Sequence, residues 1–259
     1  MALVERARAA LRFLLVPVLV LVAWQALGSR GVINTAIMSD PADIGSALLD
    51  MAAKGTLAKH VGVSLLRVAE GFALGAGAGV LLGMLVATVR PVERYLASLI
   101  GILRPIPAIA LVPLLILWFG IGEESKVAVI TIGSFWPVLI NTIHGIQSVD
   151  RQLLEVGRVL RKSRATMLVR IVLPAAMPSI FTGLRLGISS AWTCVVTAEM
   201  IAASSGVGYL ITYAREIARP DMLFVGIASI GLFGLVIDTA VLALQRRLFA
   251  WQETEASHE

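Results

Sequence analysis

Six long apolar stretches constrain the fold of this chain more than any other feature of its sequence. A helix needs about 20 mostly apolar residues to cross the hydrocarbon core of a bilayer, which is about 30 Å thick. The six stretches cover residues 11–28, 68–89, 95–120, 127–149, 178–203 and 222–244. The sequence therefore predicts an all-α membrane protein with six transmembrane helices, in a single domain over residues 1–259.

The composition disfavours a soluble protein. The chain is 58% hydrophobic and 15% charged, and its mean hydropathy is +0.86. Soluble proteins are about 45–50% apolar and about 25% charged. With 259 residues, the chain has room for several spans but not for a large soluble domain in addition. The single cysteine, Cys194, lies in an apolar run, which excludes a disulfide or a metal–cysteine site within one chain.

Basic residues orient the predicted helices. Lys and Arg concentrate in cytoplasmic loops, and an even number of spans places both chain ends on one side. With both ends in the cytoplasm, more than half of the 22 Lys and Arg residues fall in cytoplasmic segments, so the net charge of +5 does not indicate a nucleic-acid partner. In an alternative, residues 1–28 form a signal peptide, because Ala26-Leu27-Gly28 resembles a cleavage site. Cleavage there would leave five spans and an outer N-terminus.

Two outer segments carry helix signals of their own. Ser39 and Asp40 precede Pro41, as expected at a helix start, and Gly55 marks the end. The apolar residues of this helix share one face and are Ile44, Ala47, Leu48 and Met51. The helix is expected either to lie on the outer membrane surface or to pack as an ordinary surface helix. Residues 203–221 are too polar and too short to span, and are expected to cap the outer end between the fifth and sixth spans.

The cytoplasmic loop over residues 150–172 has the features of a docking surface. Asp150 precedes a helix-compatible run, as a capping residue would. Apolar residues then follow at spacings of 3 and 4, and these are Leu153, Leu154, Val156, Val159 and Leu160. Such a helix can lay its apolar face in a groove of a partner while its charges set the register. The alternative is a basic loop that only contacts lipid phosphates.

The stretch from Leu153 to Trp192 resembles the cytoplasmic loop signature of permease subunits of ATP-binding-cassette (ABC) importers. In that signature a Glu and two small residues precede a Gly, and Ile-x-Leu-Pro follows nine residues later. The matching residues are Glu155, Val156, Gly157, Ile171, Leu173 and Pro174, and Arg161 stands at the Gly position. Residues 67–83, 113–146 and 198–208 resemble the nitrate, sulfonate, taurine and bicarbonate branch of these permeases. The resemblance covers residues 35–247.

This resemblance implies a type I permease fold with cytoplasmic coupling helices that fit a cleft in an ATPase subunit. The coupling residues would be Glu155, Val156, Gly157, Arg158, Arg161, Ile171, Leu173 and Pro174. It also implies a homodimer in the bacterial inner membrane, flanked by two ATPase chains and supplied by a substrate-binding protein. The solute would be small, for example nitrate, a sulfonate, taurine or bicarbonate, and it would move by alternating access. Arg161 makes the positive φ that a Gly would adopt costly.

The chain lacks a motif for hydrolysing ATP. A P-loop needs GxxxxGK[ST], and no lysine of this chain follows a Gly. A transport subunit and not an enzyme is therefore predicted, without a cofactor of its own and with ATP and Mg²⁺ bound by the partner ATPase. The alternative is a secondary transporter driven by an ion gradient, for which Asp238 and Glu199 are weak candidates on a proton or sodium route. A membrane-bound enzyme is a third class, although no catalytic constellation is visible.

Charged residues inside spans are costly and mark candidate functional sites. Arg104 is predicted about 15 Å into the third span, beside Pro105 and Pro107, which break the helix. It is a candidate for an anion path or for a structural pair with a carboxylate or with the carbonyl oxygens that the prolines free. Glu199, near the outer end of the fifth span, is a candidate for the path or an anchor for the 203–221 cap.

Two ion pairs and one packing surface complete the predictions. Arg185 and Asp238 lie at similar depth in the fifth and sixth spans and are predicted to pair, and Arg67 is predicted to pair with Glu70. Glycines at 75, 79 and 83 give the second span a small-residue surface. That surface serves either packing within the chain or a dimer contact.

Overall fold

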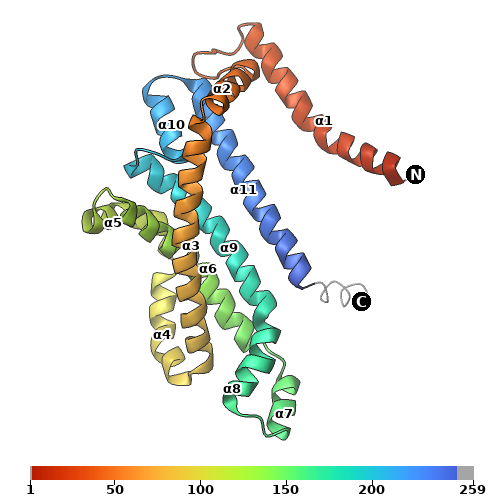
Figure 1. The fold of residues 1–259 in the computed structure, drawn as a ribbon, viewed down its shortest axis with the longest axis vertical. Coiled ribbons are helices and arrows are strands. Elements are labelled where there is room, and N and C mark those ends of the chain that lie inside the picture. Colours follow the sequence, from red (N-terminus) through yellow and green to blue (C-terminus); the bar gives the residue numbers. More distant parts are fainter. Residues whose placement is uncertain (1, 250–259) are drawn as a thin grey trace.

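A computed structural model describes residues 2–249, and the predicted single domain extends beyond them to Met1 and residues 250–259. Within the described part every regular element is helical. The helices are α1 (Ala2–Ser29), α2 (Pro41–Ala53), α3 (Thr56–Thr88), α4 (Arg90–Leu103), α5 (Val112–Phe119), α6 (Glu123–Gln147), α7 (Arg151–Val159), α8 (Arg164–Met167), α9 (Leu173–Ala202), α10 (Val207–Glu216) and α11 (Pro220–Leu248). A 3₁₀ turn, η1 (Ala108–Leu111), precedes α5, and a π-helical turn, η2 (Leu168–Val172), precedes α9 (Figure 1). The predicted all-α class is confirmed.

Four helical segments are long and apolar enough to cross a membrane: α3, α6, α11 and the segment Arg164–Glu216, which contains α9. The predicted third span is not one straight helix. It consists of α4 followed by η1 and α5, and the two parts are bent by 81°. The bend follows Pro105 and Pro107, which have no N–H to continue the helical hydrogen bonds. Counting this pair as one span gives five, and the first predicted span lies within α1, whose described apolar part is Leu15–Ser29.

The centre of the molecule is a row of three helices in which α6 lies between α3 and α9 (Figure 1). Glycines every fourth residue of α3 face α6, at positions 71, 75, 79 and 83. A Cβ on Gly75 would overlap Ser134 Oγ and the carbonyl oxygen of Thr131, whereas a Cβ on Gly77 would meet nothing within 4 Å. The small-residue surface of α3 therefore serves packing within the chain.

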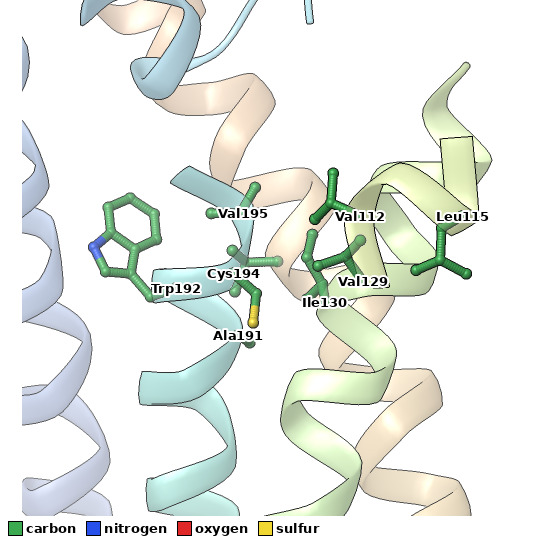
Figure 2. Packing of buried hydrophobic residues seen from close by; sticks show 9 residues of the cluster. Val112, Leu115, Val129, Ile130, Ala191, Trp192, Cys194 and Val195 are labelled. Carbon is green, nitrogen blue, oxygen red and sulfur yellow. The ribbon is translucent and has the colours of Figure 1, made fainter. Parts of the chain in front are cut away.

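Helix α5, which follows the bend, packs on the row of α3, α6 and α9 through a buried apolar cluster (Figure 2). Val112 and Leu115 of α5 belong to this cluster together with Ile130 of α6 and Val195 of α9, and all four are at most 4% exposed. Trp192 of the same cluster donates from Nε1 to the carbonyl oxygen of Ile230 at 3.1 Å, which ties α9 to α11. Among apolar lipids, such close van der Waals packing and interhelical hydrogen bonds hold helices together.

The short helices α2 and α10 cover one end of the row (Figure 1). Ala47 and Met51 of α2 pack against Leu210 of α10 and Val225 of α11, so α2 is a packed surface helix. The helix starts at Pro41 as predicted, with Asp40 at its N-cap, although the Asp40 side chain makes no capping hydrogen bond. The predicted cap over residues 203–221 contains α10, which follows a turn at Gly206 with φ of +116°.

Candidate functional site

The loop that carries the sequence signature folds into a helical hairpin, α7–turn–α8, spanning residues 151–167 at the opposite end from α2 (Figure 1). Local side chains fix both helix starts. The Asp150 carboxylate accepts from the backbone N–H of Gln152 at 2.9 Å, as predicted, and Ser163 Oγ accepts from the N–H of Thr166 at 3.2 Å. These bonds satisfy two of the N–H groups that a helix start leaves without partners.

The turn between α7 and α8 is closed by a Schellman motif centred on Arg161. The N–H of Lys162 donates to the carbonyl oxygen of Gly157 at 3.1 Å, and the N–H of Arg161 donates to that of Arg158 at 2.9 Å. Arg161 has a φ of +49°, in the left-handed region. The turn therefore takes the backbone shape of the Gly in the signature, at a cost of about 1–2 kcal/mol for a residue with a Cβ.

We expect Arg161→Gly to strengthen this turn, because Gly adopts a positive φ without the Cβ conflict. The amide of Lys162 should exchange with deuterium about 2- to 5-fold more slowly, corresponding to a gain of about 0.5–1 kcal/mol after the greater freedom of the unfolded Gly is subtracted. Hydrogen exchange of the purified protein measures this. Arg158→Gly, inside α7, should instead speed exchange in the same hairpin. Equal exchange in wild type and Arg161→Gly would contradict the idea that Arg161 is strained.

The two faces of α7 have different neighbours. Gly157 is buried, and a Cβ on it would lie 2.9 Å from Ile171 Cδ1 and 3.2 Å from Met167 Cγ. Leu154 packs on a buried cluster of Ile146, Val149, Ala176 and Ile180. The other apolar residues of α7 and the turn after it face outward and are Leu153, Val156, Val159 and Leu160, with Val159 81% exposed. The predicted single apolar face is thus divided into an anchoring side and an exposed side.

The matched signature residues accordingly have separate places. Glu155, Val156, Arg158 and Arg161 are exposed on the hairpin. Gly157 and Ile171 contact each other, and Leu173 packs beside the cluster around Ile146. Pro174 lies in the first turn of α9, and its missing N–H leaves the carbonyl oxygen of Arg170 without its usual helical donor. The π-helical turn occurs at this point, so the Ile-x-Leu-Pro segment joins the hairpin to α9.

A second feature is a cavity of about 480 Å³ at the break between α4 and η1. Its lining includes Arg104 and Pro107 at the break, Trp136 of α6, and Ser190, Thr193 and Cys194 of α9. Arg104 is the C-cap of α4, and its N–H donates to the carbonyl oxygen of Ile100 at 3.0 Å. Its side chain forms no hydrogen bond or ion pair with residues 15–249, the part of the chain whose side chains are described. Within that part, the predicted alternative of a structural pair with a carboxylate or with freed carbonyl oxygens is therefore wrong.

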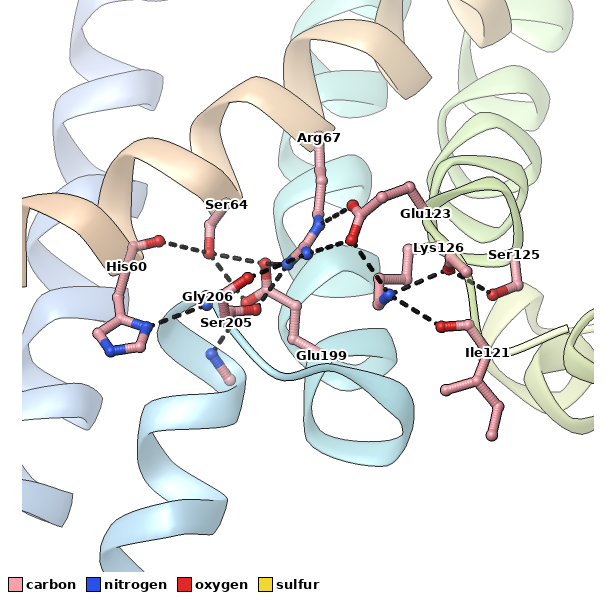
Figure 3. A network of polar contacts seen from close by, with 12 residues as sticks. His60, Ser64, Arg67, Ile121, Glu123, Ser125, Lys126, Glu199, Ser205 and Gly206 are labelled. Atoms are coloured by element: carbon pink, nitrogen blue, oxygen red, sulfur yellow. Dashed lines mark hydrogen bonds and ion pairs between the residues drawn. The ribbon is translucent and has the colours of Figure 1, made fainter.

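A third feature is a polar network at the α2 end, centred on Arg67 of α3 (Figure 3). The side chain of Arg67 is 4% exposed and that of Glu199 is fully buried. Arg67 donates from Nη1 to Glu199 at 2.9 Å and to the carbonyl oxygen of Ser205 at 2.7 Å. It also donates from Nε and Nη2 to the two carboxylate oxygens of Glu123 at 2.5 and 2.6 Å. The network therefore joins α3, the start of α6, and the end of α9.

Glu199 does not line the cavity at Arg104. Its carboxylate accepts from Ser64 Oγ at 2.8 Å and from the N–H of Gly208 at 3.0 Å, so it anchors the start of α10, as the second interpretation of this residue predicts. The prediction that Arg67 pairs with Glu70 is wrong. Glu70 is exposed on α3, and Arg67 finds its carboxylates on α6 and α9 instead. Helical spacing identifies only local pairs, which is why the sequence missed both partners and the contribution of Ser64.

Arg185 of α9 and Asp238 of α11 meet as the sequence predicts. Arg185 donates from Nε and Nη2 to the two carboxylate oxygens at 2.8 and 2.9 Å, a bidentate pair across the two helices. Among the described residues, no group of three His, Cys, Asp or Glu side chains is placed to hold a metal ion. The arrangement offers a docking surface and a solute-sized cavity, and both fit transport.

Comparison with known proteins places these features in a family. Residues 79–250 match the family described as "Binding-protein-dependent transport system inner membrane component". The chain is 39% identical over 241 residues to the "Putative aliphatic sulfonates transport permease protein SsuC" of Bacillus subtilis (strain 168), covering 93% of this chain and 87% of that protein. It is 33% identical to the "Taurine transport system permease protein TauC" of Escherichia coli (strain K12), covering 89% of this chain and 86% of that protein.

The fold has a counterpart among solved structures. A chain of the MetNI methionine ABC transporter, in an inward-facing conformation, matches with a TM-score of 0.67 at 16% sequence identity. The match covers 76% of this chain and 97% of that one. At this identity the likeness shows the fold.

Proposed function

Since this chain belongs to the family of binding-protein-dependent transport system inner membrane components, we infer that its α7–α8 hairpin docks on a cytoplasmic ATPase subunit. The chain is a permease subunit of an ABC importer. The observation that carries the docking proposal is the hairpin itself, which projects from the helix row with Leu153, Val156, Val159 and Leu160 exposed.

The hairpin has the chemistry of a short helix that fits a groove. Its exposed apolar residues lie beside Glu155 and Arg158, so a partner groove would bury the apolar side while the two charges set the register. The caps at Asp150 and Ser163 hold the hairpin in one shape before it binds. A preorganised surface loses little conformational entropy on association.

Movement of a docked hairpin would reach the membrane through α9. Gly157 packs on Ile171, and the Ile-x-Leu-Pro segment continues into α9. ATP-driven closure of two ATPase subunits would shift the hairpins and change α9 between inward-open and outward-open arrangements, which is alternating access. ATP and Mg²⁺ would be held by the ATPase chains. The permease would be a homodimer, with both chain ends and the hairpin in the cytoplasm and with α2 and α10 facing the substrate-binding protein.

The solute proposed for this importer is a small organic sulfonate. The support is the function named for the sulfonate and taurine permeases to which the chain is similar over about nine-tenths of its length.

Charge reversal at Glu155 tests the docking proposal. We expect Glu155→Lys to weaken association with the cognate ATPase at least about 10-fold, which corresponds to 1.4 kcal/mol, because a misplaced charge opposes the register that the hairpin needs. Copurification from membranes, followed by ATPase stimulation with loaded binding protein, measures the loss. The matched control for the copurification step is Glu216→Lys, an exposed glutamate on α10 at the other end of the molecule, which should leave association with the ATPase unchanged. It is not used for the stimulation step, because α10 faces the binding protein in this proposal.

Unchanged association and transport in Glu155→Lys would overturn the assignment of Glu155 to the docking contact. The alternative of an ion-gradient-driven secondary transporter has its own signature. Uptake that persists without any ATPase chain and stops when the ion gradient is collapsed would favour that alternative.

A further inference from the structure

We propose that the cavity at the break between α4 and η1 binds the anionic head of the transported solute through the guanidinium of Arg104. This inference rests on the proposed function, because it names the place in the permease where a sulfonate delivered by the binding protein would be held. In this site Arg104 would recognise the charge, and an apolar wall of the cavity would contact the rest of the solute.

The first argument is that Arg104 lines a cavity yet lacks the carboxylate partner that basic residues packed against neighbouring helices have. Arg67, Lys126 and Arg185 each have a carboxylate oxygen within 3.4 Å. Arg104 has no such partner among the described side chains of residues 15–249, although it offers five N–H donors. An unpaired charge within a membrane-spanning segment is costly and is retained at sites that handle ligands or ions. We therefore assign a bound anion as the partner that Arg104 lacks among the described side chains.

The second argument is depth. Arg104 ends α4, which has 14 residues and is thus about 21 Å long. Trp136 lies near the middle of α6, and Ser190 lies near the middle of α9. Three helices therefore place the cavity about halfway along the membrane-crossing row. Transport sites lie near the bilayer midplane and use interrupted helices, and the 81° bend after α4 is such an interruption.

The third argument is the chemistry of the lining. No Asp or Glu belongs to the lining of the cavity, so nothing described there repels an anion. Ser189 Oγ and Thr193 Oγ1 donate to helix carbonyl oxygens at 3.1 and 3.2 Å, which satisfies their own donors and leaves their oxygens able to accept. Trp136 and Ile106 add an apolar wall. The volume of about 480 Å³ lies within the range of small-molecule sites. The class that fits best is an alkanesulfonate with a short tail.

Equilibrium dialysis of the full-length permease in lipid nanodiscs against labelled butanesulfonate tests the site. We expect saturable binding that butanesulfonamide, the uncharged analogue, does not displace. Arg104→Gln should weaken this binding about 10- to 100-fold, the range for losing a hydrogen bond to a charged group. Arg94→Gln, an exposed arginine on the same helix but outside the cavity, is the matched control and should bind as wild type.

A second measurement separates binding from folding. Because Arg104 has no partner in the described chain, Arg104→Gln should raise the thermal-unfolding midpoint in the absence of ligand while it lowers binding. A lowered midpoint would instead assign Arg104 a structural role and overturn the proposal. Equal binding by wild type and Arg104→Gln would also overturn the proposal. So would the absence of saturable binding to wild type up to about 10 mM butanesulfonate, which corresponds to a binding free energy weaker than about 3 kcal/mol.

This test is independent of the ATPase. If Arg104→Gln binds like wild type while the hairpin still associates with the ATPase, the site is wrong and the importer function stands. If the ATPase does not associate but binding depends on Arg104, the docking proposal fails and the anion site stands.

Discussion

Replacing Arg67 by Met should lower the free energy of unfolding by about 3–5 kcal/mol, because it leaves the buried carboxylate of Glu199 without its cation. The methionine cannot replace the donors to Ser205 and Glu123 either. With the start of α10 anchored on the same carboxylate, the damage should spread through α10 to α2, which packs on it. Equilibrium unfolding of the purified protein in lipid measures the change.

Lys54→Met is the matched control, since it also removes a cation from an ion pair. Lys54 pairs with Asp50 at 2.7 Å, but the two side chains are 65% and 58% exposed. Exposed pairs contribute about 0–1 kcal/mol, so this variant should unfold nearly as wild type does. If Arg67→Met and Lys54→Met unfold alike, the network around Arg67 does not stabilise the fold.

Gly75→Val should prevent the normal packing of α3 on α6. The new side chain would meet Ser134 and the backbone carbonyl of Thr131, and a backbone atom cannot turn aside as a flexible side chain does. Overpacking costs about 1–3 kcal/mol and more where backbone must shift. The yield of monodisperse protein extracted from membranes and its unfolding midpoint should both fall.

The neighbouring glycine supplies the control for that variant. Gly77 lies on the same helix and is exposed, with nothing within 4 Å of an added Cβ. Gly77→Val changes the same residue type in the same segment and should retain the wild-type yield. Equal losses in the two variants would mean that helix propensity, and not contact with α6, determines the outcome.

Local signals in the sequence predicted the parts of this structure that depend on nearby residues. Asp150 caps α7, Pro105 and Pro107 accompany the bend after α4, and the apolar stretches become helices. The depths of Arg185 and Asp238 along their helices were enough to predict their ion pair, because the position of a residue in its helix fixes the height of its charge.

Features that depend on residues far apart in the chain could not be predicted from the sequence. The carboxylates that receive Arg67 lie 56 and 132 residues away, and no periodicity connects them. The division of α7 into two faces depends on which residues α9 brings to it. The left-handed turn at Arg161 was identifiable as costly, but the hydrogen bonds that close it become visible only in three dimensions.

The network around Arg67 also sets an order of events during synthesis. A growing chain presents α3 first, Glu123 at the start of α6 later, and Glu199 near the end of α9 later still. Until α9 has entered the membrane, Arg67 lacks the one carboxylate that is fully buried with it. Closure of the network is thus a completion step: a chain truncated before α9 has Glu123 as a partner for Arg67 but lacks Glu199, on which the start of α10 is anchored.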